Sequence, residues 1–292
     1  MHQNSYQNES KQFYPMRKIW LISLLITFLV MSFVEHGFTI NPEKNNVKVK
    51  KALPAVIHLF NGKDLDGWYT FLHGKGRNID PNQVFTVRNG VIRISGEDFG
   101  CITTNDEYEN YRLDVEFKWG KQTCAPRVNN ARDSGILLHS TGEDGGFSGT
   151  WMHSIECQLI EGGTGDMLVV GDGTTRFSLT CPVEPVKQDG SYVFKIGGNP
   201  ETIHEGRVNW FGRDPLWKDV KGFRGKKDLE KPLGKWNKLM ILANKNEISI
   251  YLNGTLVNQA LDVQPQKGRI QIQSEGAEIL FKRIDLSLFQ AD

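Results

Sequence analysis

Apolar and charged residues alternate strictly along residues 111–119, and this pattern restricts the fold more than any other feature of the chain. Tyr111, Leu113, Val115, Phe117 and Trp119 are apolar, and every residue between them is charged. Successive side chains of a β-strand point to opposite faces, so this segment predicts a strand with one buried and one solvated face. A helix would spread the same apolar residues around its whole surface.

The same alternation continues through most of the chain after residue 54. Strands are expected over residues 83–87, 91–95, 236–243, 247–252, 255–259, 268–274 and 278–288. Asn89-Gly90 and Asn253-Gly254 are the pairs that type I′ hairpin turns favour. In the last segment the apolar phase shifts before Ile284, which predicts a bulge near Lys282. With no long amphipathic helix visible, residues 54–292 are expected to be all-β, a single β-sandwich or jelly roll of two curved antiparallel sheets.

The N-terminal segment has a different composition. Arg17 and Lys18 precede an uncharged apolar run over residues 19–34. A basic start before a short apolar run is typical of a signal peptide, whereas a membrane span needs about 20 residues. We therefore expect residues 1–40 to be a signal peptide or an N-terminal anchor, and residues 41–53 a linker. The protein is expected to be exported to the periplasm or the extracellular space, with membrane contact only through this segment if it stays uncleaved.

Charge and cysteine usage exclude some classes of function. The net charge is +1, from 35 basic and 34 acidic residues, which argues against nucleic acid as a partner. The cysteines have no C-x-x-C spacing, so a structural zinc site is not expected. Cys157 lies in an apolar strand pattern and is expected to be a buried thiol. Cys124 and Cys181 lie in loop-like segments and are the better candidates for a disulfide.

Residues 154–161 carry the first candidate for chemistry. Ile155, Cys157 and Leu159 share one phase and should face the core, so Glu156 and Gln158 should point out together from the other face. A carboxylate and an amide two residues apart on one strand lie within about 7 Å of each other. They can form a polar wall for a sugar, with Glu156 as the catalytic group and Gln158 as a binding group. The alternative is an ordinary solvated strand face.

Residues 132–139 carry the second candidate. The run is apolar in both phases at its centre, as a central strand buried on both faces would be. His139 follows this run and can serve as an acid, a base or a metal ligand. Arg132 and Asp133 precede it and are candidate substrate-binding residues. A lone histidine in such a place can equally be structural.

A glycine-rich loop, residues 142–149, joins these two segments. It lacks the G-x-x-x-x-G-K-[ST] pattern, so phosphate binding is not expected. Trp151 and His153 follow it directly and are candidate substrate contacts. Trp151 and Trp210 are candidate platforms for a sugar face, with packing in the core as the alternative.

Two later segments also bear on the site. Gln271, Gln273 and Glu275 form a polar stripe that alternates with apolar residues, and Glu275 is expected to face the same site or a solvated edge. Residues 199–233 are long, charged and poor in strand signals. This stretch is expected to be a solvated loop, or a rim over the site, since long loops in compact domains often carry function.

Taken together, these segments resemble the 3-keto-disaccharide hydrolase domain family, which has the concanavalin A-like lectin/glucanase fold. The resemblance covers residues 54–290 and includes LFNGKDLDGW, DSGILLH, IECQLIEGGTGDM, GKWNKLMI, YLNGTLVN and GRIQIQSEGAEILFKRI. The family implies a secreted or periplasmic enzyme that cleaves glycosides already oxidised to a ketone at C3. The implied partner is an oligosaccharide or a modified glycoside.

The chemistry implied by the resemblance differs from ordinary glycoside hydrolysis. A C3 ketone acidifies the proton on C2, so a base can remove it and the group on C1 is then expelled. Such a site needs a base and a stabiliser for the developing oxyanion, often a divalent cation. Glu156 and His139 are the candidates for base and for metal ligands, and no organic cofactor is expected.

Two other functions remain open. A noncatalytic sugar-binding module of the same fold would show an aromatic-lined groove without converging ionisable groups. A conventional glycoside hydrolase would place two carboxyl groups about 5–5.5 Å or about 6.5–9.5 Å apart. The β-glucanases of this fold carry an E-x-D-x-E stripe, whereas residues 156–160 read E-C-Q-L-I, with one carboxylate in phase. This departure disfavours the conventional retaining mechanism.

Overall fold

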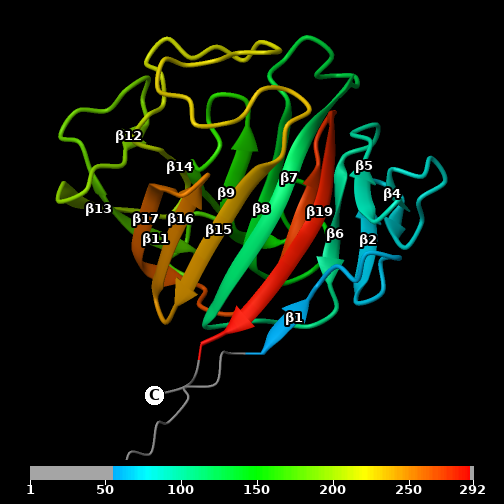
Figure 1. Ribbon diagram of the computed structural model, residues 1–292. Helices are drawn as coiled ribbons and strands as arrows, with labels where there is room; N and C mark the ends of the chain where they lie inside the picture. Colours follow the sequence, from blue (N-terminus) through cyan, green and yellow to red (C-terminus); the bar gives the residue numbers. More distant parts are fainter. Residues whose placement is uncertain (1–54, 290–292) are drawn as a thin grey trace, which may run out of the picture. The chain divides into compact units, whose positions relative to one another are not determined.

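The computed structural model describes residues 55–289, which form two large β-sheets packed face to face (Figure 1). These residues contain no α-helix, so the predicted all-β sandwich is confirmed. The predicted signal peptide or anchor and the linker lie outside the described residues. Within residues 55–289, the structure has no helix of the length and apolarity that a membrane span requires.

The first sheet has ten strands in the order β13-β11-β17-β16-β15-β7-β19-β5-β4, with β1 paired to β19. Its strands are β1 (Val56–His58), β4 (Phe85–Arg88), β5 (Val91–Ile94), β7 (Tyr111–Thr123), β11 (Ser178–Val183), β13 (Asn199–Ile203), β15 (Asn237–Asn244), β16 (Glu247–Leu252), β17 (Thr255–Gln264) and β19 (Ala277–Leu288). The alternation in β7 has its predicted effect, because its apolar residues from Tyr111 to Trp119 are buried.

The second sheet has nine strands in the order β12-β14-β10-β9-β8-β18-β6-β2-β3. Its strands are β2 (Trp68–Leu72), β3 (Gly76–Arg77), β6 (Gly100–Thr104), β8 (Asp133–Thr141), β9 (His153–Ile160), β10 (Met167–Val170), β12 (Tyr192–Val193), β14 (Gly206–Asn209) and β18 (Arg269–Ser274). All pairings in both sheets are antiparallel except β12 with β14, which is parallel. The strand β8 lies at the centre and is buried along almost its whole length, as its doubly apolar sequence predicts.

The hydrophobic core fills the space between the two sheets. Ile155, Cys157 and Leu159 of β9 point into it, and so do Ile270 and Ile272 of β18. The other phase of these strands therefore faces away from the core. Glu156, Gln158 and Gln273 occupy this outer phase, so the site must be sought on the outer face of the nine-stranded sheet.

The local turn chemistry follows the sequence closely. Asn89 and Gly90 have φ of 51° and 72° and join β4 to β5, and Asn253 and Gly254 have φ of 50° and 90° and join β16 to β17. Positive φ at both central residues is the requirement of a type I′ turn. The pairing of β19 with β7 shifts register between Phe281 and Arg283, which confirms the predicted bulge.

Two predictions about the chain's organisation are wrong. The stretch 199–233 is not strand-poor throughout, because β13 and β14 occupy its start. The suggested Cys124–Cys181 disulfide is absent, because all four cysteines are free thiols. Cys181 lies on β11 and is buried in the core with its Sγ 3.9 Å from Asn258 Oδ1. Cys157 is a buried thiol, as predicted.

Candidate functional site

A cavity of about 280 Å³ lies on the outer face of the nine-stranded sheet. Five adjacent strands supply most of its walls, in the order β14, β10, β9, β8 and β18. Its lining residues are Asp133, Phe147, Trp151, Glu156, Gln158, Leu168, Val169, Val170, Gly206, Arg207, Gln273 and Glu275. It is the place where ionisable and aromatic side chains converge on the face predicted to carry the chemistry.

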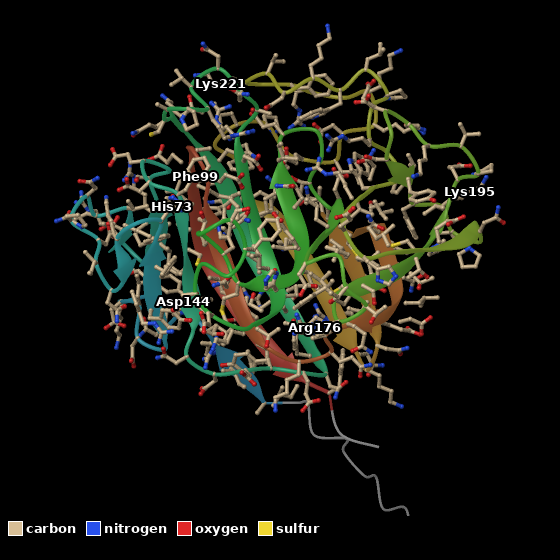
Figure 2. The ribbon with its side chains drawn as sticks, turned by 180° about the vertical axis from the view of Figure 1, so that it is seen from behind. His73, Phe99, Asp144, Arg176, Lys195 and Lys221 are labelled. Atoms are coloured by element: carbon tan, nitrogen blue, oxygen red, sulfur yellow. The ribbon has the colours of Figure 1, made fainter. Side chains whose placement is uncertain are left out.

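The glycine-rich loop covers the neighbouring part of the same face. Asp144 of this loop accepts hydrogen bonds from Tyr69 Oη (2.8 Å) and from Arg77 Nε (2.9 Å). At the other end of the loop, His73 Nδ1 donates to the Gly149 carbonyl at 3.0 Å. Figure 2 views the molecule from behind and shows His73 and Asp144 on the same side of it. These bonds hold the loop against β2 and β3, so that Phe147 and Trp151 form one wall of the cavity.

The carboxyl group of Glu156 has room in the cavity because a nearby position of the adjacent strand carries no side chain. Glu156 of β9 pairs with Leu137 of β8, and Gly135 lies two residues along β8, opposite Gln158. A Cβ at residue 135 would overlap both Glu156 Oε1 and Gln273 Oε1. The glycine therefore lets side chains from the two flanking strands meet above β8. Both of these oxygens are buried and have no hydrogen-bond partner among the described residues. A buried polar atom without a partner is costly, and such atoms are common where a ligand or a proton is to be bound.

The environment of Glu156 favours the neutral carboxyl. Its side chain is 4% exposed. Burial, and then the nearby Asp133 carboxylate, raise the pKa of Glu156 to about 8, while Arg207 opposes this rise. A carboxyl group that titrates near the working pH has the proton affinity that a general base requires.

Gln158 and Asp133 are held in one polar network. Gln158 Nε2 donates to Asp133 Oδ1 at 2.7 Å, and Arg207 Nη2 donates to Gln158 Oε1 at 2.9 Å. On its other side, Asp133 Oδ2 lies 3.0 Å from Arg127 Nη2. Burial and the Glu275 carboxylate raise the pKa of Asp133, and Arg127 opposes them. The network fixes the orientation of the Gln158 amide. Glu156 Oε1 takes no part in it and has no hydrogen-bond partner among the described residues.

Glu275 is the third carboxyl group of the cavity. It follows β18 directly and is partly buried. Burial, and then the charge of Glu156, raise the pKa of Glu275 to about 8. Because Glu156 and Glu275 repel each other when both are charged, the pair tends to keep a proton near neutral pH.

The structure brings together five of the predicted site residues and separates the others. Glu156, Gln158, Asp133, Trp151 and Glu275 all line the cavity. The other four do not line it: Arg132, His139, His153 and Trp210.

His139 lies on the core side of the sheet, so the prediction that it joins Glu156 is wrong. The pairing of β8 with β9 shifts register between Leu138 and Thr141, and His139 has a φ of 54°. This bulge turns the ring inward, where it packs edge-on against Tyr111 of the other sheet at 5.7 Å between ring centroids. His139 Nδ1 donates to the Pro265 carbonyl at 2.8 Å, and burial lowers its pKa. The imidazole is therefore neutral and part of the core.

The remaining three residues also have structural partners. Trp210 is 1% exposed and belongs to the core, so it offers no platform. Arg132 is buried in an ion pair with Glu161 at 2.7 Å. The ring of His153 packs against the ring of Phe177, with 4.9 Å between the two ring centroids, and does not line the cavity.

Glu156 and His139 cannot hold one metal ion together, because they lie on opposite faces of the sheet. Within residues 55–289, no group of three or more His, Cys, Asp or Glu side chains is arranged to bind a metal. The described donor set therefore does not match the expected divalent cation, and we derive no step through a metal.

The sequence pattern does not identify Arg207 or Phe147 as site residues, and it gives Gln273 only as part of the polar stripe of residues 271–275. Arg207 is hidden because its strand, β14, lies in the stretch 199–233, which is expected to be a loop. The signal that reveals it is the alternation of Arg207 and Asn209 with the buried Val208 and Trp210. β14 pairs with β10 so that Arg207 lies opposite Leu168, which itself lies opposite Glu156.

Comparisons with known proteins give the following relatives. The family model for the 3-keto-alpha-glucoside-1,2-lyase-like domain matches residues 55–287. No curated protein matches the chain.

Among solved structures, a candidate glycosyl hydrolase from Parabacteroides distasonis shares 18% identity at a TM-score of 0.47, covering 80% of this chain and 94% of that one. The β-glucanase of Bacillus licheniformis shares 13% identity at a TM-score of 0.42, and the match covers 82% of this chain and 100% of the β-glucanase chain. The carbohydrate-binding module CBM66 from Bacillus subtilis shares 12% identity at a TM-score of 0.41, and the match covers 76% of this chain and 95% of the CBM66 chain.

Proposed function

Because the chain belongs to the 3-keto-alpha-glucoside-1,2-lyase-like domain family, we propose that it cleaves glycosides whose sugar carries a ketone at C3. Glu156 is the general base that removes the proton from C2. The product sugar holds a new double bond between C1 and C2, and water can add to it afterwards in this site or elsewhere.

One observation carries this proposal. Glu156 is buried in a cavity, one of its oxygens has no partner among the described residues, and its pKa is raised to about 8. Removal of a proton next to a ketone is favoured by a base of this strength in a site shielded from water. A surface carboxylate with a pKa near 4 is a weaker base for the same step.

The proposed reaction runs in two stages. The C2–H bond breaks, the proton moves to the ionised Glu156, and the electron pair forms an enolate whose charge lies on the C3 oxygen. The C3 ketone then re-forms, and the C1–C2 double bond forms as the C1–O bond breaks. The leaving oxygen takes a proton from Glu275, which holds the proton that the two carboxyl groups share near neutral pH when Glu156 is ionised. The guanidinium of Arg207, at the edge of the same cavity, stabilises negative charge on the sugar oxygens during the step.

A second function is favoured by the same pair of carboxyl groups. Glu156 and Glu275 both line the cavity, and two carboxyl groups are what a conventional glycoside hydrolase uses. The two functions differ in their substrates, because the conventional mechanism needs no ketone at C3.

The experiment compares a 3-keto-α-glucoside with its unoxidised parent, each with and without a chelator. Turnover of the keto sugar alone supports the proposal, and turnover of the parent at a similar rate supports the conventional hydrolase. Glu156→Gln should reduce turnover of the keto sugar by about 10²–10⁴-fold, the typical loss when a catalytic base is removed. Glu107→Gln is the matched control, because Glu107 is exposed and lines no part of the cavity. Full activity of Glu156→Gln would refute the assigned role.

We also propose that the enzyme is exported, with residues 1–40 as the targeting segment. The support is the basic pair Arg17-Lys18 before the uncharged run 19–34. N-terminal sequencing of the protein from its producing cell tests this, and recovery of an intact N-terminus in the cytoplasm would contradict it.

A further inference from the structure

A cavity of about 450 Å³ lies at one end of the sandwich and shares no lining residue with the candidate site. Trp119 of β7, Arg132 just before β8 and Glu161 just after β9 supply one part of its lining, and the segment 221–233 supplies the other. Figure 2 shows Lys221 at the top of the molecule, whereas β1 lies at the bottom in Figure 1. The cavity is therefore at the end of the sandwich opposite to β1.

The carboxylate that lines this cavity is already bound by the protein. Glu161 Oε1 accepts a hydrogen bond from Arg132 Nη1 at 2.7 Å. Glu161 Oε2 accepts hydrogen bonds from the Gly222 N–H at 2.7 Å and from the Arg132 N–H at 3.0 Å. The charges of Glu161 and Arg132 offset each other, so the field in the cavity is set by its other charged groups.

Six exposed lysines surround the opening of this cavity or lie near it in the sequence. They all belong to residues 217–235, which we call the basic loop: Lys218, Lys221, Lys226, Lys227, Lys231 and Lys235. Within residues 55–289, the ion pairs of lysine side chains all involve lysines outside this loop. Lys221 and Lys231 line the cavity itself, and Lys221 Nζ donates to Thr123 Oγ1 at 3.0 Å, which holds it there.

The acidic residues of the basic loop are bound by other groups of the protein. Asp219 Oδ2 accepts a hydrogen bond from Asn130 Nδ2 at 2.7 Å, and Asp228 Oδ2 lies 3.0 Å from Arg224 Nε. Glu230 is buried. The loop therefore presents positive charges to solvent while its negative charges are paired or buried, and such a segregated surface attracts ligands with repeated negative charges.

We propose that this cavity and the basic loop bind an acidic polysaccharide, a chain of sugars that carry carboxylate or sulfate groups. The cavity volume falls in the range for ligand pockets, about 300–1,000 Å³, and suits one sugar unit of the chain. Lys221 and Lys231 bind the acidic group of this unit, and Trp119 and Leu233 offer apolar surface to its C–H groups. The other four lysines do not line the cavity, so their charge fits the neighbouring units of a longer chain rather than one small anion.

The same surface is less suited to two other polyanions. A lipid bilayer is flat and cannot place a headgroup-bearing chain along the loop and a unit inside the cavity together. Nucleic acids bound without sequence preference stack their bases on exposed aromatic side chains. Trp217 and Phe223 of the basic loop are only partly exposed and pack against each other, with 6.2 Å between the ring centroids.

The test measures binding to the whole protein by isothermal titration calorimetry. Its probes are polygalacturonate, dextran sulfate and neutral dextran. We expect at least one acidic chain to bind and neutral dextran not to bind, and the two acidic chains show whether carboxylate or sulfate is preferred. Raising the salt from 50 to 200 mM should weaken binding about tenfold, as expected when about three charges are neutralised.

Substitutions locate the binding surface. The triple variant Lys221→Gln, Lys227→Gln and Lys231→Gln should weaken binding of the acidic chain about tenfold. The matched control is Lys63→Gln, Lys187→Gln and Lys245→Gln, which removes the same charge from exposed lysines outside the basic loop. Equal losses in the two variants, binding of neutral dextran, or no binding of either acidic chain would overturn the proposal.

A further pair of variants separates the cavity from the loop around it. Leu233→Glu puts a negative charge at the cavity and should weaken binding about as much as the triple variant, whereas Leu288→Glu at the end of β19 should not; both leucines are exposed. Unchanged binding in Leu233→Glu would reject the cavity as the binding site. Tighter binding of duplex DNA, or of phosphatidylcholine vesicles with 30% phosphatidylglycerol, would replace the polysaccharide by that partner. None of these measurements depends on turnover, so their outcome is independent of the proposed function.

Discussion

Replacing Glu156 by glutamine should make the protein more stable at the same time as it abolishes turnover. The variant keeps the volume of the side chain and removes its charge. Its amide keeps a hydrogen-bond donor near Gln273 Oε1, as the protonated carboxyl group of Glu156 does. The substitution therefore relieves one unfavourable feature of the cavity, the buried ionisable group.

The magnitude follows from the pKa of Glu156, which burial raises from 4.5 to about 8. Between these two values the unfolded chain carries the charge and the folded protein keeps the proton. The folded state therefore loses stability as pH rises, by about 1.4 kcal/mol for each pH unit. The loss reaches about 3 kcal/mol at pH 7 and about 5 kcal/mol above pH 8, and the glutamine of the variant does not suffer it.

The assay is thermal and urea unfolding of both proteins at pH 5, 7 and 9. The midpoint of the variant should exceed that of the wild type by about 6–12 °C at pH 7, with little difference at pH 5. Glu107→Gln changes the net charge equally and should show no such divergence. Wild-type and variant curves that stay parallel from pH 5 to pH 9 would refute the reasoning.

Three further predictions concern the candidate site and the strand β8 beside it. The pH profile of kcat/KM should be bell-shaped with its maximum near pH 8, because Glu156 must lose a proton and Glu275 must keep one. A value of kcat/KM that rises steadily to pH 10 would contradict these roles. Gly135→Ala should reduce turnover at least 100-fold, since the new methyl group displaces the flexible ends of the Glu156 and Gln273 side chains. The free energy of unfolding should change by less than about 1 kcal/mol. Unchanged kinetics would show that the position of these two side chains does not matter for turnover. His139→Asn should keep kcat within twofold in the folded protein, because asparagine tolerates positive φ and the histidine ring lies in the core. A tenfold loss of kcat in a fully folded variant would show that His139 contributes to the site.

The parts of the structure that depend on local chemistry could be predicted from the sequence. The Asn-Gly turns and the bulge near Lys282 are local features, and the alternation of β9 correctly placed Glu156 and Gln158 on the face opposite Ile155. The polar stripe of β18 was recognised for the same reason.

The errors arose where a local irregularity or a distant partner decides the outcome. His139 was misplaced because one residue with positive φ reverses the phase of a strand, and no residue near it signals that reversal. Trp210 has the same residue type as a sugar platform, but its place in the core is set by packing from both sheets. Cys124 and Cys181 looked alike in sequence, although Cys181 belongs to a core strand.

The first and last described strands have a consequence for how this domain can be joined to others. β1 pairs with the end of β19, with Val56 opposite Ser287, and His58 Nδ1 lies 2.7 Å from Asp285 Oδ1. The two ends of the sandwich are therefore neighbours on the ten-stranded sheet, whereas the candidate site is on the other sheet. Such a domain can be spliced as a whole into a surface loop of a host protein, or its ends can be connected and the chain reopened elsewhere. In both cases the face that carries the candidate site stays free.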